Sequence, residues 1–322
     1  MKKFIITMIL LAFIFTLSIV VKNNNKEKST ELKKIKVAEV THSIFYTPLY
    51  IADKMGYFKE RGLDVEIILT SGADKVATAV MSKDVQIGFC GSEQTLYIYN
   101  KGAKDYLVNF AVLTKRDGSF IVSRNNNDTF SLNDLEGKII LGGRNGGMPA
   151  MTLKYTLHKN GINAKVDTSV DFAGLSGAFI SGKGDYVTLF EPNALTLEKQ
   201  KKGYAVKSVG EIGGEVPYTA FNTLKSYAND NPEVLENFKI ALQKGVDYTL
   251  NSSNDVIANK LKDYFPDTNV KDIETVVKRY KDIDAWYKKI NMTEDSFNHM
   301  QDIVEYNGFL EKRVDFKTLY YE

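Results

Sequence analysis

The segment THSIFYT, at residues 41–47, carries aromatic rings and hydroxyl groups directly after a stretch of alternating apolar residues. The rings of His42, Phe45 and Tyr46 can stack on a planar ligand, and the Ser43 hydroxyl can bond to its edge. The alternative is that Phe45 and Tyr46 only pack against the helix that follows. We expect at least one of the three rings to contact a ligand, because the segment follows a predicted strand.

Ser92 and Glu93 stand at the start of a predicted helix, residues 93–100. Ser92 can cap this helix, or it can turn toward an oxygen of a ligand. Glu93 lies in the first turn, where the helix dipole favours a negative charge, and the alternative is a solvated surface acid. We count both residues as candidate ligand contacts.

A glycine-rich loop at residues 142–147 leads from a predicted strand into a helix that begins at Pro149. Backbone amides of Asn145, Gly146 and Gly147 can meet a polar ligand at the start of that helix. Neither the P-loop nor the dinucleotide-binding spacing of glycines is present. The alternative is a tight turn with no ligand. We favour ligand contact, because the loop should face the preceding half of the molecule.

Glu191 follows a predicted strand at residues 186–190 and precedes Pro192. A carboxylate that faces an enclosed cleft needs a partner, because burying it unpaired is costly. An amine, an amidine-like group or a cationic ring would satisfy it, whereas a sulfonate or nitrate would be repelled. The alternative is an ion pair with Arg144 or Lys183. We favour ligand contact for Glu191.

A strand–helix–strand unit positions the first of these groups. Alternating apolar residues predict strands at 35–40 and 64–69, and a helix between them begins with Pro48 and ends at Gly56. Such a unit implies parallel strands joined by a right-handed crossover. The loop after its first strand lies at the carboxyl edge of the sheet, where open α/β folds bind ligands.

A second α/β series follows the polar string at residues 124–128, which marks a lobe boundary. From residue 231 onward the apolar spacing is helical. We therefore expect the chain to enter a second lobe and to return, so that its helical tail covers the first. Further strands are predicted at residues 85–90, 106–114, 120–123, 138–141, 166–172, 186–190 and 204–209.

Composition limits the function. The 322 residues suffice for two lobes, and 42 basic against 40 acidic residues argue against a nucleic-acid partner. The single cysteine, Cys90, lies in an apolar strand and is interpreted as a buried thiol. Asp117, beside Arg116 at the end of a strand, is interpreted as satisfying local charges. No catalytic or metal-binding motif stands out, so we expect no enzymatic activity, no cofactor and no metal.

The beginning of the chain is typical of a targeting segment, because Lys2 and Lys3 precede an apolar stretch at residues 4–21. We interpret residues 1–21 as a signal peptide or membrane anchor and residues 22–34 as a polar linker. The protein is therefore expected outside the cytoplasm, at the cell surface or in the periplasm, either secreted or tethered.

Four segments resemble the substrate-binding proteins of ABC importers, in the nitrate/sulfonate/taurine and thiamine-pyrimidine group. They are FYTPLYIA with GYF at 45–58, DVQIGF at 84–89, LNDLEGK at 132–138, and DYV with FEP at 185–192. The resemblance implies a type II periplasmic-binding-protein-like α/β clamshell, with residues 35–123 and 220–322 in lobe 1 and 124–219 in lobe 2. The chain departs from lipid-anchored members, because no cysteine follows its apolar stretch.

The resemblance also implies a small-molecule ligand, an ABC permease as partner and a monomer. We favour thiamine or an aminopyrimidine-type heterocycle as ligand. A sulfonate, taurine or nitrate is the alternative. An enzyme that makes the thiamine pyrimidine shares this fold, but the resemblance would then imply a cysteine-rich motif, and the chain has one cysteine. An extracellular sensor is the remaining alternative.

Overall fold

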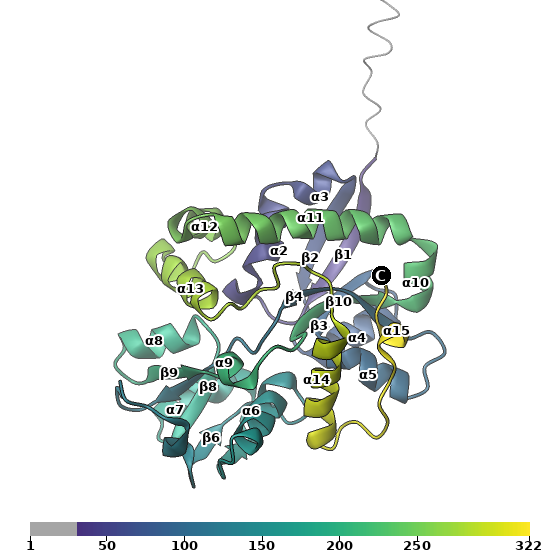
Figure 1. Ribbon diagram of the computed structural model, residues 1–322. Coiled ribbons are helices and arrows are strands. Elements are labelled where there is room, and N and C mark those ends of the chain that lie inside the picture. Colours follow the sequence, from purple (N-terminus) through teal and green to yellow (C-terminus); the bar gives the residue numbers. More distant parts are fainter. Residues whose placement is uncertain (1–30) are drawn as a thin grey trace, which may run out of the picture. The chain divides into compact units, whose positions relative to one another are not determined.

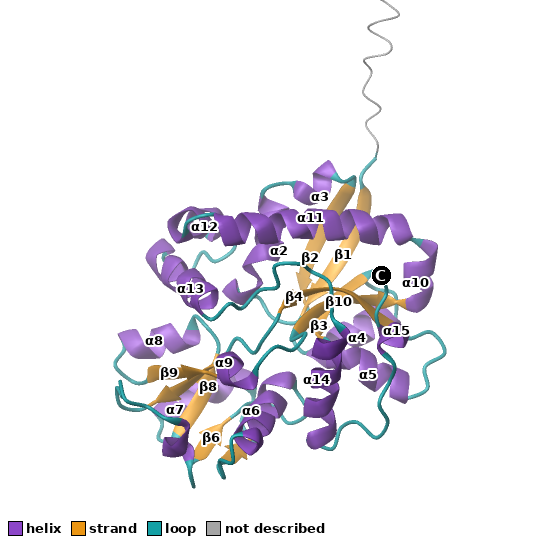
Figure 2. Ribbon diagram, in the orientation of Figure 1, coloured by secondary structure: helices purple, strands orange, loops and turns teal. Residues whose placement is uncertain are grey.

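The computed structural model describes residues 31–322, which contain two separate five-stranded sheets with helices packed around them (Figure 2). The predicted signal peptide or anchor and most of the predicted linker lie outside the described residues. The first strand begins at Lys33, inside the predicted linker. The sequence did not indicate this start, because the first two residues of the strand are exposed lysines, which carry no apolar signal. No helix among residues 31–322 combines the length and apolar character needed to span a membrane.

The first sheet has the strand order β2-β1-β3-β10-β4. Strand β1 runs parallel to β3, and β10 runs antiparallel to both β3 and β4. The predicted strand–helix–strand unit is present, and Gly56 ends its helix in a left-handed conformation (φ 74°) that glycine adopts without strain. The elements are β1 (Lys33–Glu39), η1 (Ile44–Tyr46), α2 (Thr47–Lys54), α3 (Tyr57–Glu60), β2 (Leu63–Leu69), α4 (Ala73–Met81), β3 (Ile87–Gly91), α5 (Glu93–Asn100), β4 (Leu107–Thr114) and β10 (Thr219–Leu224).

The second sheet has the strand order β7-β6-β8-β5-β9. Strand β6 is parallel to β7 and β8, whereas β5 is antiparallel to β8 and β9. The elements are β5 (Phe120–Ser123), η2 (Leu132–Leu135), β6 (Ile139–Leu141), α6 (Met148–Lys159), β7 (Lys165–Asp167), η3 (Phe172–Gly174), α7 (Leu175–Ile180), β8 (Tyr186–Leu189), α8 (Asn193–Lys199), β9 (Tyr204–Ser208) and α9 (Val209–Gly213).

Strand β5 corrects the predicted lobe boundary. It pairs with β8 and β9 in the second sheet, although the predicted boundary at residue 124 places it in the first lobe. Its apolar alternation would suit either sheet, so the polar string at 124–128 marked a loop within the second lobe. The chain crosses between the two sheets at residues 115–119 and 214–218.

The helical tail packs mainly on the first sheet, as predicted. Helix α11 lies along α2 and α3 (Figure 1). Gly245 allows this approach, because a Cβ there would collide with the Pro48 carbonyl oxygen. In the core beneath, the Phe221 ring stacks on Phe89 with centroids 4.2 Å apart and meets the Phe238 ring edge to face at 5.2 Å. The tail comprises α10 (Lys225–Asp230), α11 (Pro232–Asn251), α12 (Asn254–Leu261), α13 (Val270–Asp282), α14 (Glu294–Tyr306) and α15 (Phe316–Leu319). The predicted two-lobed α/β fold is confirmed.

Candidate ligand-binding site

His42 is held within the first lobe. Its Nδ1 lies 2.8 Å from Glu39 Oε1, and its Nε2 lies 2.8 Å from the Tyr264 carbonyl oxygen. Its ring stacks on Phe265 with centroids 4.6 Å apart. The hydrogen bond to Glu39 raises the pKa of His42. Both ring nitrogens therefore have protein partners.

Phe45 joins the loop to the second lobe. Its ring is 1% exposed and lies 5.8 Å from Phe190, 6.2 Å from Tyr218 and 4.9 Å from Tyr280. The Ser43 hydroxyl accepts a hydrogen bond from the Phe45 amide at 3.2 Å and so caps the short helix η1. Phe190 follows β8, and Tyr218 lies on a crossing segment, so these rings come from three parts of the fold.

Tyr46 and Ser92 are buried in the same region. The Tyr46 ring packs on Phe89 at 4.4 Å, and burial raises the pKa of its hydroxyl. The Ser92 side chain does not cap α5, which was one of its two expected roles; its hydroxyl instead donates to the Pro217 carbonyl, and Met300 Sδ lies 2.8 Å from the hydroxyl oxygen. The Ser92 hydroxyl therefore fastens helix α5 to a crossing segment.

Glu93 is a buried acid rather than a solvated one. Its Oε1 accepts a hydrogen bond from Gln94 Nε2 at 3.0 Å, whereas its Oε2 has no partner among the described residues. The carboxylate folds over Gly91, where any Cβ would collide with Oε2. Burial raises the pKa of Glu93 to about 7, against the opposing effects of Gln94 and Arg144.

The glycine-rich loop faces the first lobe, as predicted. The Tyr97 hydroxyl donates to the Gly146 carbonyl at 3.3 Å, and Arg144 Nη1 lies 3.1 Å from Asp74 Oδ1. Asn145 Oδ1 accepts a hydrogen bond from Lys154 at 3.1 Å. The Gly147 amide bonds within the turn, to the Arg144 carbonyl at 3.4 Å.

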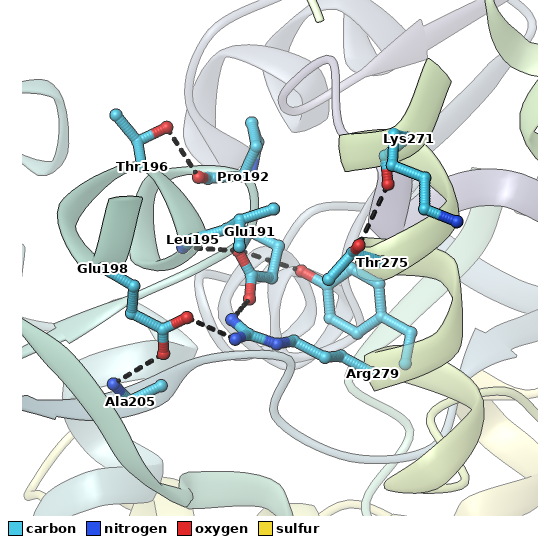
Figure 3. Close-up of polar contacts among 10 residues, drawn as sticks. Glu191, Pro192, Leu195, Thr196, Glu198, Ala205, Lys271, Thr275 and Arg279 are labelled. Carbon is cyan, nitrogen blue, oxygen red and sulfur yellow. Dashed lines mark hydrogen bonds and ion pairs between the residues drawn. The ribbon is translucent and has the colours of Figure 1, made fainter. Parts of the chain in front are cut away.

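Glu191 has a charge partner that its position in the sequence did not indicate. Its Oε1 lies 2.5 Å from Arg279 Nη1, and its Oε2 accepts a hydrogen bond from the Leu195 amide at 2.9 Å (Figure 3). Arg279, on α13 of the first lobe, also pairs with Glu198. Burial raises the pKa of Glu191, and the Arg279 charge opposes that rise.

The two expected partners of Glu191 are engaged elsewhere, since Arg144 pairs with Asp74 and Lys183 Nζ lies 3.4 Å from Asp167. Glu191 therefore forms an ion pair that links the two lobes.

Asp117 and Tyr218 lie on the two crossing segments, and neither was among the predicted site residues. Asp117 is fully buried, and its Oδ1 accepts hydrogen bonds from the Ser119 amide at 2.7 Å and hydroxyl at 2.5 Å. Asp117 Oδ2 and the Tyr218 hydroxyl lie close enough to interact, yet within the described part of the chain neither completes a hydrogen bond of good geometry. Burial raises the pKa of Asp117 to about 6. The sequence signal that could have identified Asp117 is an acid next to a glycine, Gly118, in a short link between two strands.

We define the lobe junction as the group formed by Phe45, Tyr46, Glu93, Asp117, Phe190 and Tyr218. Within residues 31–322, no group of three His, Cys, Asp or Glu side chains is arranged to hold a metal ion. The junction instead combines aromatic rings with buried carboxyl groups, which suits an organic ligand that has both a ring and polar donors.

Two linked α/β lobes with polar groups at the facing ends of their strands define the class of two-lobed periplasmic binding proteins. Residues 44–255 match the model of the family described as NMT1/THI5 like. "Putative binding protein YtlA" of Bacillus subtilis (strain 168) is 42% identical over 298 residues, which cover 91% of this chain and 89% of the relative. The chain therefore belongs to the NMT1/THI5-like family, and the predicted family relationship is confirmed.

Solved structures share the fold at low sequence identity. The alkanesulfonate-binding protein SsuA from Xanthomonas axonopodis pv. citri, bound to MOPS, has a TM-score of 0.71 at 15% identity, and the match covers 90% of this chain and 99% of SsuA. The periplasmic nitrate-binding protein NrtA from Synechocystis PCC 6803 has a TM-score of 0.66 at 16% identity, covering 89% and 85%. These similarities show that this chain shares the two-lobed fold of those two binding proteins.

Proposed function

We propose that the protein is the extracytoplasmic solute-binding component of an ABC importer and that it holds a small organic ligand at the lobe junction. The single observation that carries this proposal is the buried Glu93 carboxyl group at the carboxyl end of β3, whose Oε2 has no partner in the described chain and whose charge acts on Tyr46, Tyr97 and Tyr218. An unpaired buried carboxylate is costly in a protein interior, and a bound ligand would offset that cost.

The favoured ligand is a cationic or amino-substituted heterocycle, such as thiamine or its aminopyrimidine precursor. The rings of Phe45 and Tyr46 would contact the heterocycle, and Glu93 would accept a hydrogen bond from its amino group. Asn145, Gly146 and Gly147 would approach from the second lobe, where the loop already contacts Tyr97. The remaining predicted residues, His42, Ser43, Ser92 and Glu191, would act mainly by positioning the loop, helix α5 and the facing lobe.

Binding would work by closure of the lobes. The ion pairs of Arg279 with Glu191 and of Arg144 with Asp74 link the two lobes, and they would help to hold a closed form. A ligand that contacts both lobes only when they close shifts the equilibrium toward that form. The permease in the membrane would then accept the closed form, and the ligand would leave chemically unchanged.

An alkanesulfonate, taurine or nitrate is the second candidate. It is favoured by the two solved structures described above, which are an alkanesulfonate-binding protein and a nitrate-binding protein. The unpaired Glu93 carboxyl group argues against it above its raised pKa of about 7, where the group is ionised and its buried charge repels an anion.

A thermal-shift screen of the full chain tests the proposal. The panel contains thiamine, aminopyrimidines, riboflavin, taurine, alkyl sulfonates and nitrate. We expect a heterocycle to raise the melting temperature, since a ligand at 100 times its Kd stabilises by about 2.7 kcal/mol. Stabilisation by sulfonates or nitrate alone would overturn the favoured ligand class. Conversion of a bound ligand into a product would overturn the assignment as a binding protein.

A further inference from the structure

His42 has a hydrogen-bond acceptor facing each of its ring nitrogens. Nε2 lies 2.8 Å from the Tyr264 carbonyl oxygen, and Nδ1 lies 2.8 Å from Glu39 Oε1. A carbonyl oxygen cannot donate, so Nε2 carries a hydrogen. The Tyr50 hydroxyl, 3.1 Å from Nδ1, donates its one proton to Glu39 Oε2 at 2.5 Å and has none left for the ring. Nδ1 therefore also carries a hydrogen, and the contacts fit the doubly protonated, positively charged imidazole.

The surroundings of His42 favour its charged form. Glu39 is 2% exposed, and its hydrogen bond raises the pKa of His42 above the ordinary value of 6.5, although burial acts in the opposite direction. The His42 side chain is 36% exposed, so a proton can pass between the ring and water. Neighbouring titratable groups on α2 and on the link from α12 to α13 form pairs of their own, namely the Tyr264 hydroxyl with Asp53 and Lys54 with Asp263. Glu39 is therefore the charged group in direct contact with the ring.

The contact joins two segments that stand 222 residues apart in the sequence. His42 lies in the loop at residues 41–47 that carries Phe45, and Tyr264 lies in the link at residues 262–269 that leads into α13. The His42 ring also stacks on Phe265 of that link, with centroids 4.6 Å apart. We call the hydrogen bonds of His42 to Glu39 and to Tyr264 the His42 clasp.

Helix α13 follows the clasp directly and contacts both the loop and the second lobe. Its Tyr280 ring lies 4.9 Å from the Phe45 ring, and the Tyr280 hydroxyl accepts a hydrogen bond from the Glu191 amide at 3.1 Å. Its Arg279 pairs with the Glu191 carboxylate. The placement of α13 therefore affects the packing of Phe45 and the ion pair between the lobes together.

We propose that His42 is a positioning residue whose protonation holds the loop at residues 41–47 to the start of α13, and that loss of one proton releases this contact. A neutral imidazole has one N–H and can satisfy only one of the two acceptors. If the N–H stays toward Tyr264, a nitrogen lone pair faces the Glu39 carboxylate, and if it stays toward Glu39, the Tyr264 carbonyl loses this hydrogen bond. A rise in pH should therefore loosen α13 and favour separation of the lobes. The release of a ligand by this route rests on the proposed function, whereas the clasp itself does not.

NMR of the full chain with ¹⁵N-labelled histidine tests the protonation state. The sequence has three histidines, so His158→Gln and His299→Gln assign the other two rings and leave the clasp intact. At pH 6.5, where a free imidazole is half protonated, His42 should be mainly doubly protonated, because its pKa is raised. Tyr264→Phe is the matched control and should leave this titration unchanged, because it removes the hydroxyl that bonds Asp53 but keeps the carbonyl that faces His42. A His42 that is half protonated at or below pH 6.5 in the wild-type chain would overturn the proposal, whether or not a ligand binds.

The fluorescence of Trp286 tests the coupling to α13. It is the only tryptophan in the sequence, its ring lies 6.1 Å from the Tyr280 ring, and its Nε1 donates to the Phe45 carbonyl at 2.7 Å. The wild-type emission should shift between about pH 6 and about pH 9, along the His42 titration. Because Glu93, with a pKa of about 7, also titrates in this range, the informative quantity is the part of the shift that His42→Gln lacks. Equal shifts in the two proteins would overturn the coupling.

Small-angle X-ray scattering tests the consequence for the lobes. The wild-type radius of gyration should increase from about pH 6 to about pH 9, and that of His42→Gln should change less. An equal radius in the wild type at both pH values would overturn the link to lobe separation. Failure of every compound in the thermal-shift panel to bind would instead overturn the proposed function and leave the clasp standing.

Discussion

Glu93 in the first lobe and Glu191 in the second stand at corresponding places, each two residues beyond the end of a strand, and each is at most 2% exposed. Their surroundings differ. Both oxygens of Glu191 have protein partners, Arg279 and the Leu195 amide, whereas one oxygen of Glu93 has none in the described chain. Burial alone therefore does not distinguish the two acids, whereas the presence of protein partners for both oxygens does, and for this reason we propose Glu93 rather than Glu191 as the acid that meets the ligand.

Glu191 and Glu93 therefore have different roles in this account. Glu191 and Glu198 hold Arg279 across the lobes, so this cluster contributes to closure (Figure 3). Glu93 keeps an acceptor oxygen without a partner in the described chain, at the start of α5, where the neighbouring Ser92 is bonded to the crossing segment at Pro217. Substitutions in the Arg279 cluster and substitutions at Glu93 should therefore affect different measurements.

Removal of the Arg279 guanidinium should have the largest effect on stability. Arg279→Ala leaves two acids at the lobe contact without their cation, and breaking a buried pair in this way costs about 3–5 kcal/mol. Chemical denaturation should show this loss in the free energy of unfolding. Arg279→Lys, which keeps the charge but not the two-pronged geometry, should lose less. A loss below about 1 kcal/mol in Arg279→Ala would show that Glu191 is not held as described.

The raised pKa of Glu93 should make stability depend on pH. The folded carboxyl group keeps its proton up to a pKa of about 7, whereas its ordinary value is 4.5. Between these values the folded state binds more protons, so stability should fall as the pH rises from 4.5 to 7, by about 3 kcal/mol. Glu93→Gln should show a decline smaller by about this amount between pH 4.5 and pH 8, because the raised pKa of Asp117 still contributes in both proteins. Parallel curves for the two proteins would contradict an unpaired, buried Glu93.

The exposed pair between the lobes should contribute least. Asp74 and Arg144 are both more than half exposed, and such pairs are worth about 0–1 kcal/mol. Asp74→Asn should therefore leave the unfolding free energy nearly unchanged, and added salt should reduce even that difference. A loss comparable to that of Arg279→Ala would indicate that closure depends on the loop of Arg144 rather than on the buried cluster.

Local patterns predicted most of the architecture and part of the site. The strand–helix–strand unit, the helical tail and the inward-facing glycine loop follow from periodicity, Pro48 and Gly56, which act over a few residues. Arg279 stands 88 residues from Glu191, and its pairing depends on how α13 packs, which no local pattern encodes. Strand β5 was misplaced for a similar reason, because its apolar residues suit either sheet. Asp117 was interpreted as a locally satisfied charge, because burial on a crossing segment has no periodic signal.

The most direct measurement is the affinity of an aminopyrimidine, thiamine included, for the wild-type chain, Glu93→Gln and Glu191→Gln by calorimetry. Loss of a charge-assisted hydrogen bond in Glu93→Gln should weaken binding by about 1–3 kcal/mol. Glu191→Gln should weaken it less, since the change acts only through closure. Unchanged affinity in Glu93→Gln, with the larger loss in Glu191→Gln, would contradict the account and make Glu191 the acid that meets the ligand.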